Sequence, residues 1–585
     1  MKNFGWKGTF SEFISADKDD LVNSLCQQVY DQSLSEAYAH PVAESTLPQI
    51  KSWYDSIEYL MKEIPYFDEM PGYLIFEYEM LRRGGKRPDV LLFLPGELLV
   101  LEFKRYSNVK EPEYNQLSLY LRDLQSYHST VQEFALTVRG GLILTTEEKA
   151  YEINHDFQVY QLGKEGLRNW VQLIIKHTKN NSSLPIDDFL NGTYQPLPSI
   201  IESAKAIMRN KPLPQIKTVK TSNFDTVITE VQSIIENAKK QKTHHLVLVT
   251  GVPGAGKTFV GLTLAYHADK AVYLSGNRPL VEVLQDSLQN EHFVQSLYAY
   301  KTDYQKGRIP EDHVLIFDEA QRAWDAKKMG GNKSEPDIIM EIAKQKSWSV
   351  VVGLIGEGQE IHIGEEGGIG LWNTAIANKG IIVHARHHQA TFPNAIKYDE
   401  NPDLHLHTSL RTHNALMYFD WVEAFLEGDL QRSNKLLRKL KESRYTVKFV
   451  DSLEEAKRYV QQVYAGTDKT YGMVMSSGMK FVKEIKALPF GERYETPKPH
   501  VAYFNYPNSP YYCRNLEYAA TEFQVQGLEL DMAIVYWGED LDWRNNKWKI
   551  NFPRKGAENP EQMKLNAYRV LLTRGRDGVI IVKSK

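Results

Sequence analysis

Short apolar runs separated by helical patterns dominate the chain beyond residue 240. Residues 246–249, 271–274, 314–317 and 349–355 are each an apolar run of strand length. A second series, at 446–450, 472–475, 533–536 and 578–582, follows from about residue 402. Continuous apolar runs of this length predict strands that are buried on both faces. Because they alternate with helical segments, we expect parallel sheets flanked by helices, which is an α/β fold.

The first 180 residues carry a different pattern, and a polar segment separates them from the rest. Apolar positions at helical spacing predict a helix over 50–64. Residues 88–94 and 98–104 are apolar runs on either side of a turn at 95–97, which predicts a hairpin. Residues 180–223 are rich in asparagine, serine and proline. We therefore expect an α/β domain over 1–180, a Pro-rich linker region over 181–225, and two α/β lobes over 226–400 and 401–585.

Composition narrows the class of protein. The 585 residues are 42% hydrophobic and 25% charged, which excludes a disordered, collagen-like or disulfide-scaffold protein. Two cysteines, Cys26 and Cys513, are too few for a disulfide framework and suit a reducing compartment. No uncharged apolar run approaches the length of a membrane span, and no secretory signal is visible, so we expect a cytoplasmic protein with no membrane partner. The net charge of −4 means that nucleic-acid binding would need a local basic groove.

Residues 251–258 have the sequence G-V-P-G-A-G-K-T, which matches the phosphate-loop pattern G-x-x-x-x-G-K-[ST]. Gly251, Gly254 and Gly256 would let backbone N–H groups close around phosphate oxygens. Lys257 would reach the β- and γ-phosphates, and the Thr258 hydroxyl would bind Mg²⁺. The pattern lies between an apolar strand and an apolar helix, as this mechanism requires, so it predicts ATP and Mg²⁺ as cofactors.

The apolar run at 314–317 is followed directly by Asp318-Glu319-Ala320-Gln321. A carboxylate at the carboxyl end of a strand can hold Mg²⁺, and this is the role that we predict for Asp318. The adjacent Glu319 can polarise the attacking water. These two acids would therefore complete the chemistry of the phosphate loop.

The same four residues resemble the D-E-x-Q motif of superfamily-one helicases, and further matches follow in that family's order. The matching segments are S-G-N-R-P at 275–279, G-E-G-Q at 356–359, T-S-L-R at 408–411, Q-G-L-E-L-D at 526–531 and L-L-T-R-G-R at 571–576. The resemblance implies two RecA-like lobes that close on ATP, with Gln359 sensing the γ-phosphate and Arg411 and Arg574 acting as arginine fingers. It also implies a single-stranded nucleic acid as the partner along which the motor steps.

Three phrases are closer to one subgroup: D-E-A-Q-R-A-W at 318–324, G-Q-E-I at 358–361 and Y-R-V-L-L-T-R-G at 568–575. They resemble the prokaryotic ATPases that are related to the helicase-like part of Schlafen proteins. This resemblance extends from about residue 246 to the last residues of the sequence.

The hairpin at 88–104 carries Asp89, Glu102 and Lys104. Glu102 and Lys104 lie two residues apart, so they share one face of a strand. The hairpin brings Asp89 back toward them, although the strand register is not evident from the sequence. Two carboxylates and a lysine that converge can hold a divalent cation and activate water against a phosphodiester. We therefore predict Asp89 and Glu102 as ligands of Mg²⁺ or Mn²⁺, and Lys104 as the group that stabilises charge at the attacked phosphate.

This pattern resembles the PD-(D/E)xK nuclease core. Gln116 and Tyr120 stand four residues apart on a predicted helix and resemble the Q-x-x-x-Y element of RecB-like nucleases. Glu77 matches the upstream carboxylate of that core, a role for which Glu79 competes. The resemblance implies an N-terminal α/β nuclease domain in which Glu77, Gln116 and Tyr120 are auxiliary residues. The alternative is a nuclease fold that no longer cleaves and serves as a nucleic-acid-binding module.

Two further features each have two interpretations. The basic residues between 432 and 448 would form either a strand-binding face or a solvated helix face. Trp543, Trp548 and Phe552 alternate with basic residues, which suits either base stacking or an ordinary β-insert.

The combination of these parts resembles the bacterial nuclease–helicase immunity (Nhi-type) proteins of anti-phage defence. The function that we expect is an ATP- and Mg²⁺-dependent nuclease–helicase acting on nucleic acid, with single-stranded or partly single-stranded DNA as the expected partner. The alternatives are a DNA-repair nuclease–helicase and an ATP-gated nucleic-acid sensor with an inert nuclease fold. The sequence does not indicate an oligomeric state.

Overall fold

The structure is a computed structural model. It describes residues 4–36, 47–80, 87–106, 109, 111–148, 151–154, 159–176, 184–192, 200–208, 223–251, 255–327, 329, 331–356, 368–386, 389–407, 413–442, 445–465, 467, 469–479, 484–491, 496–553 and 559–583. The chain divides into two compact units. The first is Met1–Pro196 with Glu442–Arg444 and Tyr459–Lys469, and the second is Leu197–Lys441 with Tyr445–Arg458 and Thr470–Lys585.

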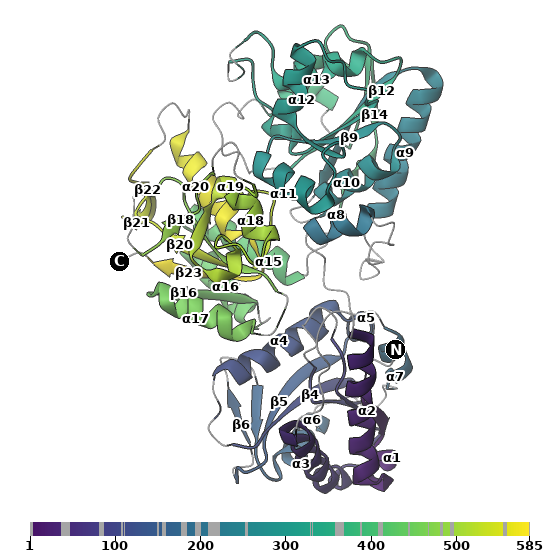
Figure 1. The fold of residues 1–585 in the computed structure, drawn as a ribbon, viewed down its shortest axis with the longest axis vertical. Coiled ribbons are helices and arrows are strands. Elements are labelled where there is room, and N and C mark those ends of the chain that lie inside the picture. Colours follow the sequence, from purple (N-terminus) through teal and green to yellow (C-terminus); the bar gives the residue numbers. More distant parts are fainter. Residues whose placement is uncertain are drawn as a thin grey trace. The chain divides into compact units, whose positions relative to one another are not determined.

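The first unit is built on a mixed sheet, part of which is labelled in Figure 1. Its strand order is β1-β2-β3-β4-β5-β7-β6. Its first four strands pair antiparallel, β4, β5 and β7 pair parallel, and β6 is antiparallel to β7. The bounds are β1 (Trp6–Thr9), β2 (Tyr73–Phe76), β3 (Val90–Leu94), β4 (Glu97–Lys104), β5 (Thr137–Leu144), β6 (Tyr151–Asn154) and β7 (Val159–Leu162).

Helices cover both faces of this sheet. One face carries α1 (Phe10–Ser15), α2 (Lys18–Glu36), α3 (Leu47–Glu63) and α6 (Gly166–Ile175). The other carries α4 (Glu111–Tyr127), α5 (Ser129–Glu133) and α7 (Ile186–Asn191). Alternate residues of β3 and β4 enter the two apolar cores, which is why both strands are apolar at nearly every position.

The predicted hairpin is present as β3 and β4. Leu94 pairs with Glu97, so a two-residue turn of Pro95 and Gly96 joins the strands. Proline fixes a negative φ at the first turn position, and Gly96 takes a φ of +76°, which is the glycine position of a type II turn. The register places Val90 opposite Leu101, so Asp89 lies beside the strand segment that carries Glu102.

The Pro-rich segment differs from a plain linker. Within 181–225, α7 packs Phe189 into the first unit, where its ring stacks on His128 with a centroid separation of 3.9 Å. Further on, α8 (Ile200–Met208) packs Ala204 and Ile207 into the second unit. A few apolar side chains thus anchor short helices within this segment, one in each compact unit.

The second unit begins with a parallel sheet in the order β10-β9-β11-β12-β8-β13-β14, and β15 pairs with the end of β8. The strands are β8 (His244–Gly251), β9 (Ala271–Ser275), β10 (Val294–Ser296), β11 (Val314–Phe317), β12 (Ser349–Leu354), β13 (Ile381–Ala385), β14 (Lys397–Glu400) and β15 (His405–Leu406). The strands predicted at 246–249, 271–274, 314–317 and 349–355 correspond to β8, β9, β11 and β12. The sheet also takes in β15, which lies beyond residue 400.

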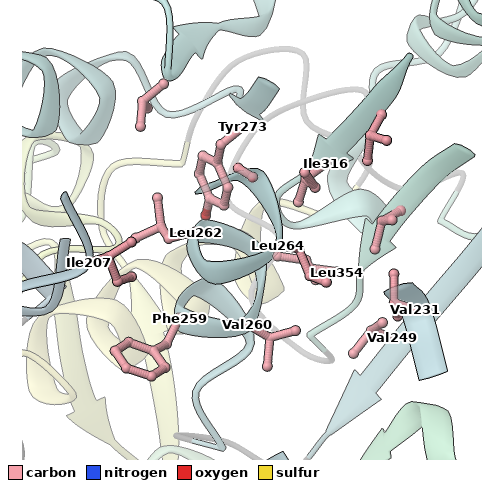
Figure 2. Packing of buried hydrophobic residues seen from close by; sticks show 14 of the residues in the cluster. Ile207, Val231, Val249, Phe259, Val260, Leu262, Leu264, Tyr273, Ile316 and Leu354 are labelled. Carbon is pink, nitrogen blue, oxygen red and sulfur yellow. The ribbon is translucent and has the colours of Figure 1, made fainter. Parts of the chain in front are cut away.

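Two apolar cores sandwich this sheet. The first lies under α8, α9 (Phe224–Gln241), α10 (Lys257–His267) and α11 (Arg278–Leu288), and Figure 2 shows its packing around α10. The second lies under α12 (Leu297–Gln305), α13 (Glu335–Lys344) and α14 (Gly370–Ile376). The helix α10 therefore starts at the carboxyl end of the central strand β8 and is buried along most of its length.

The second unit also contains a second parallel sheet in the order β16-β23-β20-β17-β19-β18. Its strands are β16 (Thr446–Val450), β17 (Tyr471–Met475), β18 (Lys486–Ala487), β19 (Tyr518–Thr521), β20 (Leu530–Trp537) and β23 (Gly575–Lys583). The helices of this region are α15 (His413–Glu427), α16 (Leu430–Glu442), α17 (Leu453–Val463), α18 (Pro499–Asn505), α19 (Glu522–Val525) and α20 (Pro560–Leu572). All four strands that the sequence predicts for this region are present.

A separate hairpin, β21 (Leu541–Arg544) with β22 (Lys547–Ile550), completes the second unit. Among the described residues, no helix is both long and apolar enough to cross a membrane. The fold observed is thus a mixed α/β fold whose second unit contains two parallel sheets, as the sequence predicts.

Candidate functional site

The phosphate-loop residues lie where the central strand of the first parallel sheet gives way to a helix. Gly251 is the last residue of β8, and Gly256 precedes α10 with a φ of +84°, which glycine adopts without strain. Lys257 and Thr258 form the first turn of α10, and the Lys257 ammonium donates to the Gly251 carbonyl at 2.9 Å. The lysine therefore contacts the residue that ends β8. Gly254 lies outside the described residues.

Asp318 and Glu319 follow β11, and a single strand, β12, separates β11 from β8 in the sheet. Asp318 is buried, and burial together with the neighbouring Glu319 carboxylate raises the pKa of Asp318 to about 7, against smaller opposing contributions from Tyr273, Arg322 and Lys257. Glu319 has a φ of +54°, a left-handed conformation that a non-glycine residue adopts at a cost. Its carboxylate lies 3.5 Å from the Arg322 guanidinium.

Gln321 connects the ends of β11 and β12. Its side-chain nitrogen donates to Glu319 Oε2 at 2.5 Å, and its side-chain oxygen accepts from the Gly356 backbone N–H at 2.9 Å. A Cβ built at Gly356 would lie 3.3 Å from Glu319 Oε2 and 3.5 Å from the Lys257 Cε. The lysine, the glutamate and the glutamine thus meet at one point at the carboxyl edge of the sheet. Gln359 lies outside the described residues.

Of the two residues predicted as arginine fingers, Arg411 lies outside the described residues. The strand that precedes it, β15, pairs with Thr250 and Gly251. Arg574 follows α20, and its guanidinium donates to the carbonyls of Val570, Val525 and Leu528 at 2.8, 3.2 and 3.0 Å. In this structure Arg574 thus satisfies carbonyls at a helix end and in the adjoining loop of its own lobe. Its role as a finger stays a prediction.

Residues of the second lobe reach the first lobe at α11. The side-chain amide of Asn277 donates to the backbone carbonyl of Gln526, and Glu282 accepts from His500 at 2.6 Å and from Lys498. Burial alone would raise the pKa of Glu282, but hydrogen bonds from His500, Lys498 and Arg278 outweigh it and lower the pKa to about 2. The helix α11 is therefore tied to α18 and the residue before it by an ionised carboxylate.

The first unit brings Asp89, Glu102 and Lys104 together. Asp89 Oδ2 accepts from the Phe103 backbone N–H at 2.7 Å, and the Lys104 ammonium lies 3.4 Å from Glu102 Oε2. Glu102 is 2% exposed, and its Oε1 has no hydrogen-bond partner among the described residues. An orphaned carboxylate oxygen at a buried position is costly, and a bound cation or protonation would relieve that cost.

Electrostatics in this cluster follow from burial of like charges. The pKa of Glu102 is raised to about 8, mainly because the side chain is buried and secondly because the Asp89 carboxylate is close to it. The Lys104 ammonium lowers this pKa and so opposes the rise. The pKa of Glu77 is also raised, mainly by burial and secondly by Asp89. The Oε1 atom of Glu77 accepts a hydrogen bond from the Trp53 indole at 2.7 Å. Burial raises the pKa of Asp89 too, against the opposing effects of Lys104 and the Phe103 N–H. If all three carboxyl groups ionised, the cluster would hold more negative charge than its one lysine offsets, so each resists ionising beside the others.

Gln116 and Tyr120 lie on one face of α4, as their spacing predicts. The Gln116 amide donates to the Tyr120 hydroxyl at 3.1 Å. Their auxiliary role stays a prediction. Among the described residues, no group of three or more His, Cys, Asp and Glu side chains is arranged to hold a metal ion by itself. A cation at either candidate site would therefore take further ligands from water or from a phosphate.

The two features with alternative interpretations can be placed. Trp543 pairs directly with Trp548 across the β21–β22 hairpin, and the Trp548 indole donates to the Phe425 carbonyl at 3.2 Å. These two rings pack as part of a β-insert. Helix α16 presents Arg432, Lys435, Arg438 and Lys439 to solvent and buries Leu440, which is compatible with both interpretations of that segment.

Sequence reasoning left out several residues of the nucleotide site. Gln321 is the last residue of the D-E-A-Q motif and Gly356 is the first residue of G-E-G-Q. Both motifs are evident in the sequence, but the contact between these two residues is not. Tyr273 lies in the core beside Asp318 and has the appearance of an ordinary strand residue. Gln526 lies against the Arg322 guanidinium, a contact that joins two motifs from different lobes.

No curated protein sequence matches the chain. Among solved structures, the chain is similar to the Pif1 helicase from Bacteroides in complex with ADP-AlF3 and ssDNA, with 10% identity over 60% of this chain and 91% of that one and a TM-score of 0.29. It is also similar to the Pyrococcus furiosus Hef helicase domain, with 14% identity over 61% of this chain and 95% of that one and a TM-score of 0.21.

These TM-scores are low, and the assignment rests on a family match instead. The family described as Schlafen group 3, DNA/RNA helicase domain matches residues 244–584, which is more than half of the 585-residue chain. The matched range starts at β8 and includes every residue of the nucleotide site. The predicted Schlafen-related helicase part is thereby confirmed, and the chain belongs to the Schlafen group 3 DNA/RNA helicase domain family.

Proposed function

We propose that the second unit is an ATP-driven motor that moves on nucleic acid, with single-stranded DNA as its track. The observation that carries this proposal is the meeting of Lys257, Glu319 and Gln321 at Gly356. A phosphate-binding lysine and a carboxylate suited to orient water stand at the carboxyl edge of one parallel sheet, which is the usual position of a site in such folds.

Each residue has a chemical role in this proposal. Lys257 would contact the β- and γ-phosphates, and its hydrogen bond to the Gly251 carbonyl supports this role by holding the ammonium next to the start of the phosphate-loop sequence. Thr258 and Asp318 would hold Mg²⁺, and they fit it because Asp318 is a buried oxygen ligand beside a second carboxylate. The ion would neutralise charge on the phosphates. Glu319 would orient the attacking water while Gln321 fixes its carboxylate.

An ATPase assay titrated with oligonucleotides tests the motor. Lys257→Ala should abolish hydrolysis while circular dichroism shows an unchanged fold, and single-stranded DNA should stimulate the wild type. The matched control is Lys270→Ala, because Lys270 is half-exposed and pairs only loosely with Glu311 at 3.8 Å. Unchanged hydrolysis in Lys257→Ala would contradict the site. A flat response to DNA and RNA would favour the ATP-gated sensor.

We further propose that the first unit is a metal-dependent nuclease. The supporting observation is that Asp89, immediately before β3, lies beside Glu102 and Lys104 of β4, with one Glu102 oxygen left without a partner among the described residues. Buried carboxyl groups that resist ionising together, and an orphaned oxygen, fit a divalent cation, Mg²⁺ or Mn²⁺, held by Asp89 and Glu102. Lys104 would stabilise charge on the attacked phosphate.

Cleavage of labelled single- and double-stranded DNA and RNA, with Mg²⁺ or Mn²⁺ and with or without ATP, tests the nuclease. Asp89→Ala and Glu102→Ala should abolish cleavage, and Lys104→Ala should slow it, while ATP hydrolysis by the second unit continues. Glu69→Ala is the control, because Glu69 is an exposed acid of the same unit. Equal cleavage by all variants would place the activity elsewhere. No cleavage by wild type would favour an inert nuclease fold.

The biological role that we propose is anti-phage defence, and it rests on the resemblance of the combined parts to nuclease–helicase immunity proteins. Cells expressing wild type should resist phage infection, and both Lys257→Ala and Glu102→Ala should lose that resistance. A DNA-repair role would instead appear as sensitivity of the mutant cells to DNA damage with no change in phage plating.

A further inference from the structure

Tyr273 is a fully buried tyrosine that lies against the phosphate-loop helix. It is on β9, opposite Ile316 of β11, and belongs to the core around α10 (Figure 2). A Cβ built at Gly261 of α10 would lie 2.8 Å from the Tyr273 Cε2 and 2.7 Å from Leu354 Cδ1. A glycine inside a helix costs about 1 kcal/mol relative to alanine, and here its missing side chain makes room for the ring.

The position of the ring directs its hydroxyl toward the nucleotide site. Ile316, the partner of Tyr273 in the sheet, precedes Asp318 by two residues, so both side chains lie on the face that α10 covers. Gly261 stands one helical turn after Thr258. The phenol is therefore located between the strand end that carries Asp318 and the first turn of α10.

The Tyr273 hydroxyl has no hydrogen-bond partner of normal geometry among the described residues. The polar groups that act on it are the Asp318 carboxylate, the Thr258 hydroxyl and the Glu319 carboxylate. A buried hydroxyl without a partner costs about 1–3 kcal/mol, and native cores contain few of them. A tyrosine hydroxyl carries its proton at neutral pH, so it can donate as well as accept a hydrogen bond.

We propose that Tyr273 is a positioning residue for the cation of the nucleotide site. Its hydroxyl would donate to one oxygen of Asp318 and accept from the Thr258 hydroxyl, because a hydroxyl can do both. Each partner would then keep an oxygen lone pair directed at Mg²⁺. The inference rests on the proposed ATP site and deepens it, since it names a residue that orients the two cation ligands without touching the nucleotide.

Tyr273→Phe tests this proposal because it keeps the ring and removes only the hydroxyl. The measurement is equilibrium binding of a fluorescent ADP analogue to the full chain, once in excess Mg²⁺ and once in EDTA. In EDTA the affinity of the variant should match that of wild type. The gain in affinity on adding Mg²⁺ should fall about tenfold, which is the loss expected when a partner of a metal ligand is removed.

The matched control is Tyr300→Phe. Tyr300 is also buried, and its hydroxyl donates to Asp312 at 2.9 Å, away from the nucleotide site. A Mg²⁺-dependent gain in Tyr273→Phe equal to that of wild type and of Tyr300→Phe would overturn the proposal. So would a lowered melting temperature with unchanged Mg²⁺ dependence, because it would show a purely structural hydroxyl. A wild-type protein that binds no nucleotide under either condition would instead contradict the ATP site itself.

Discussion

The side-chain oxygen of Gln321 accepts a hydrogen bond from the backbone N–H of Gly356 at 2.9 Å. The nitrogen of the same amide donates to Glu319. One side chain thus joins the acid that we assign to water activation with the backbone just beyond the end of β12.

Gln321→Ala should separate nucleotide binding from hydrolysis. The substitution releases the Glu319 carboxylate and leaves the buried Gly356 N–H without a partner, at a cost of about 1–3 kcal/mol. We expect the turnover number for ATP to fall about tenfold or more, because about 1.4 kcal/mol corresponds to a factor of ten in rate, whereas ADP affinity stays close to wild type. Steady-state ATPase kinetics and ADP titration measure the two effects. Gln345→Ala, an exposed glutamine after α13, is the control, and equal turnover in both variants would contradict the role.

Glu282→Gln should loosen the contact between α11 and α18. The ionised carboxylate accepts from Arg278, Lys498 and His500, and a neutral amide cannot offset those cations. We expect backbone amides of α18 to exchange hydrogen faster in the variant, as measured by mass spectrometry. Glu291→Gln, an exposed acid just beyond α11, should leave that exchange unchanged. Identical protection in all three proteins would show that apolar packing alone holds the two helices.

Buried histidines should make the second unit sensitive to acid. His245 Nδ1 and His384 Nε2 lie 2.8 Å apart, and His384 Nδ1 lies 2.9 Å from Asp399. The pKa of His245 is lowered from an ordinary 6.5 to about 4, mainly because the ring is buried and secondly because His384 lies beside it. The unfolded chain then binds more protons than the folded one between these values. The contribution of His245 to the free energy of unfolding is therefore fully present above about pH 6.5, and it is lost as the pH falls toward 4.

Scanning calorimetry of the full chain at pH 5 and pH 7 tests this dependence. The transition that belongs to the second unit is identified by its upward shift with ADP and Mg²⁺. His245→Gln should flatten the pH dependence of that transition. His267→Gln, at the end of α10, should retain it. A wild-type transition that is equally stable at both pH values would exclude the network as an acid-sensitive element.

The sequence predicts best those site residues that stand directly at the end of an apolar strand. Lys257, Asp318 and Glu319 follow β8 and β11, and parallel strands bring their carboxyl ends to one edge whatever their order. The Gln321–Gly356 contact depends on the left-handed turn at Glu319 and on β11 lying beside β12. Neither is visible in a motif.

Other positions illustrate different limits of the sequence. The register of the hairpin decides that Asp89 lies beside Phe103, and only the two-residue turn at Pro95 and Gly96 sets that register. Nothing in the sequence marks Tyr273 as a site residue, because a tyrosine in an apolar strand has the same pattern as an ordinary core residue. Arg574 illustrates a third limit: a motif gives the residue but not whether its guanidinium is held by nearby carbonyls.

A divalent cation should reverse the effect of Glu102→Gln on the stability of the first unit. At a pH above about 8 and without cation, the variant should unfold less readily than wild type, because the substitution removes a carboxylate whose ionised form is disfavoured by burial and by Asp89. With Mn²⁺, wild type should gain stability, by about 2.7 kcal/mol at a hundredfold excess over the dissociation constant, and the variant should gain little. Hydrogen exchange of β3 and β4 measures this unit separately from the nucleotide site. Glu69→Gln should behave as wild type in both conditions, because its exposed carboxylate neither repels the cluster nor binds the ion. If Mn²⁺ protected Glu102→Gln as strongly as wild type, Glu102 would not be a cation ligand, and the carboxylate cluster would have to be explained by protonation alone.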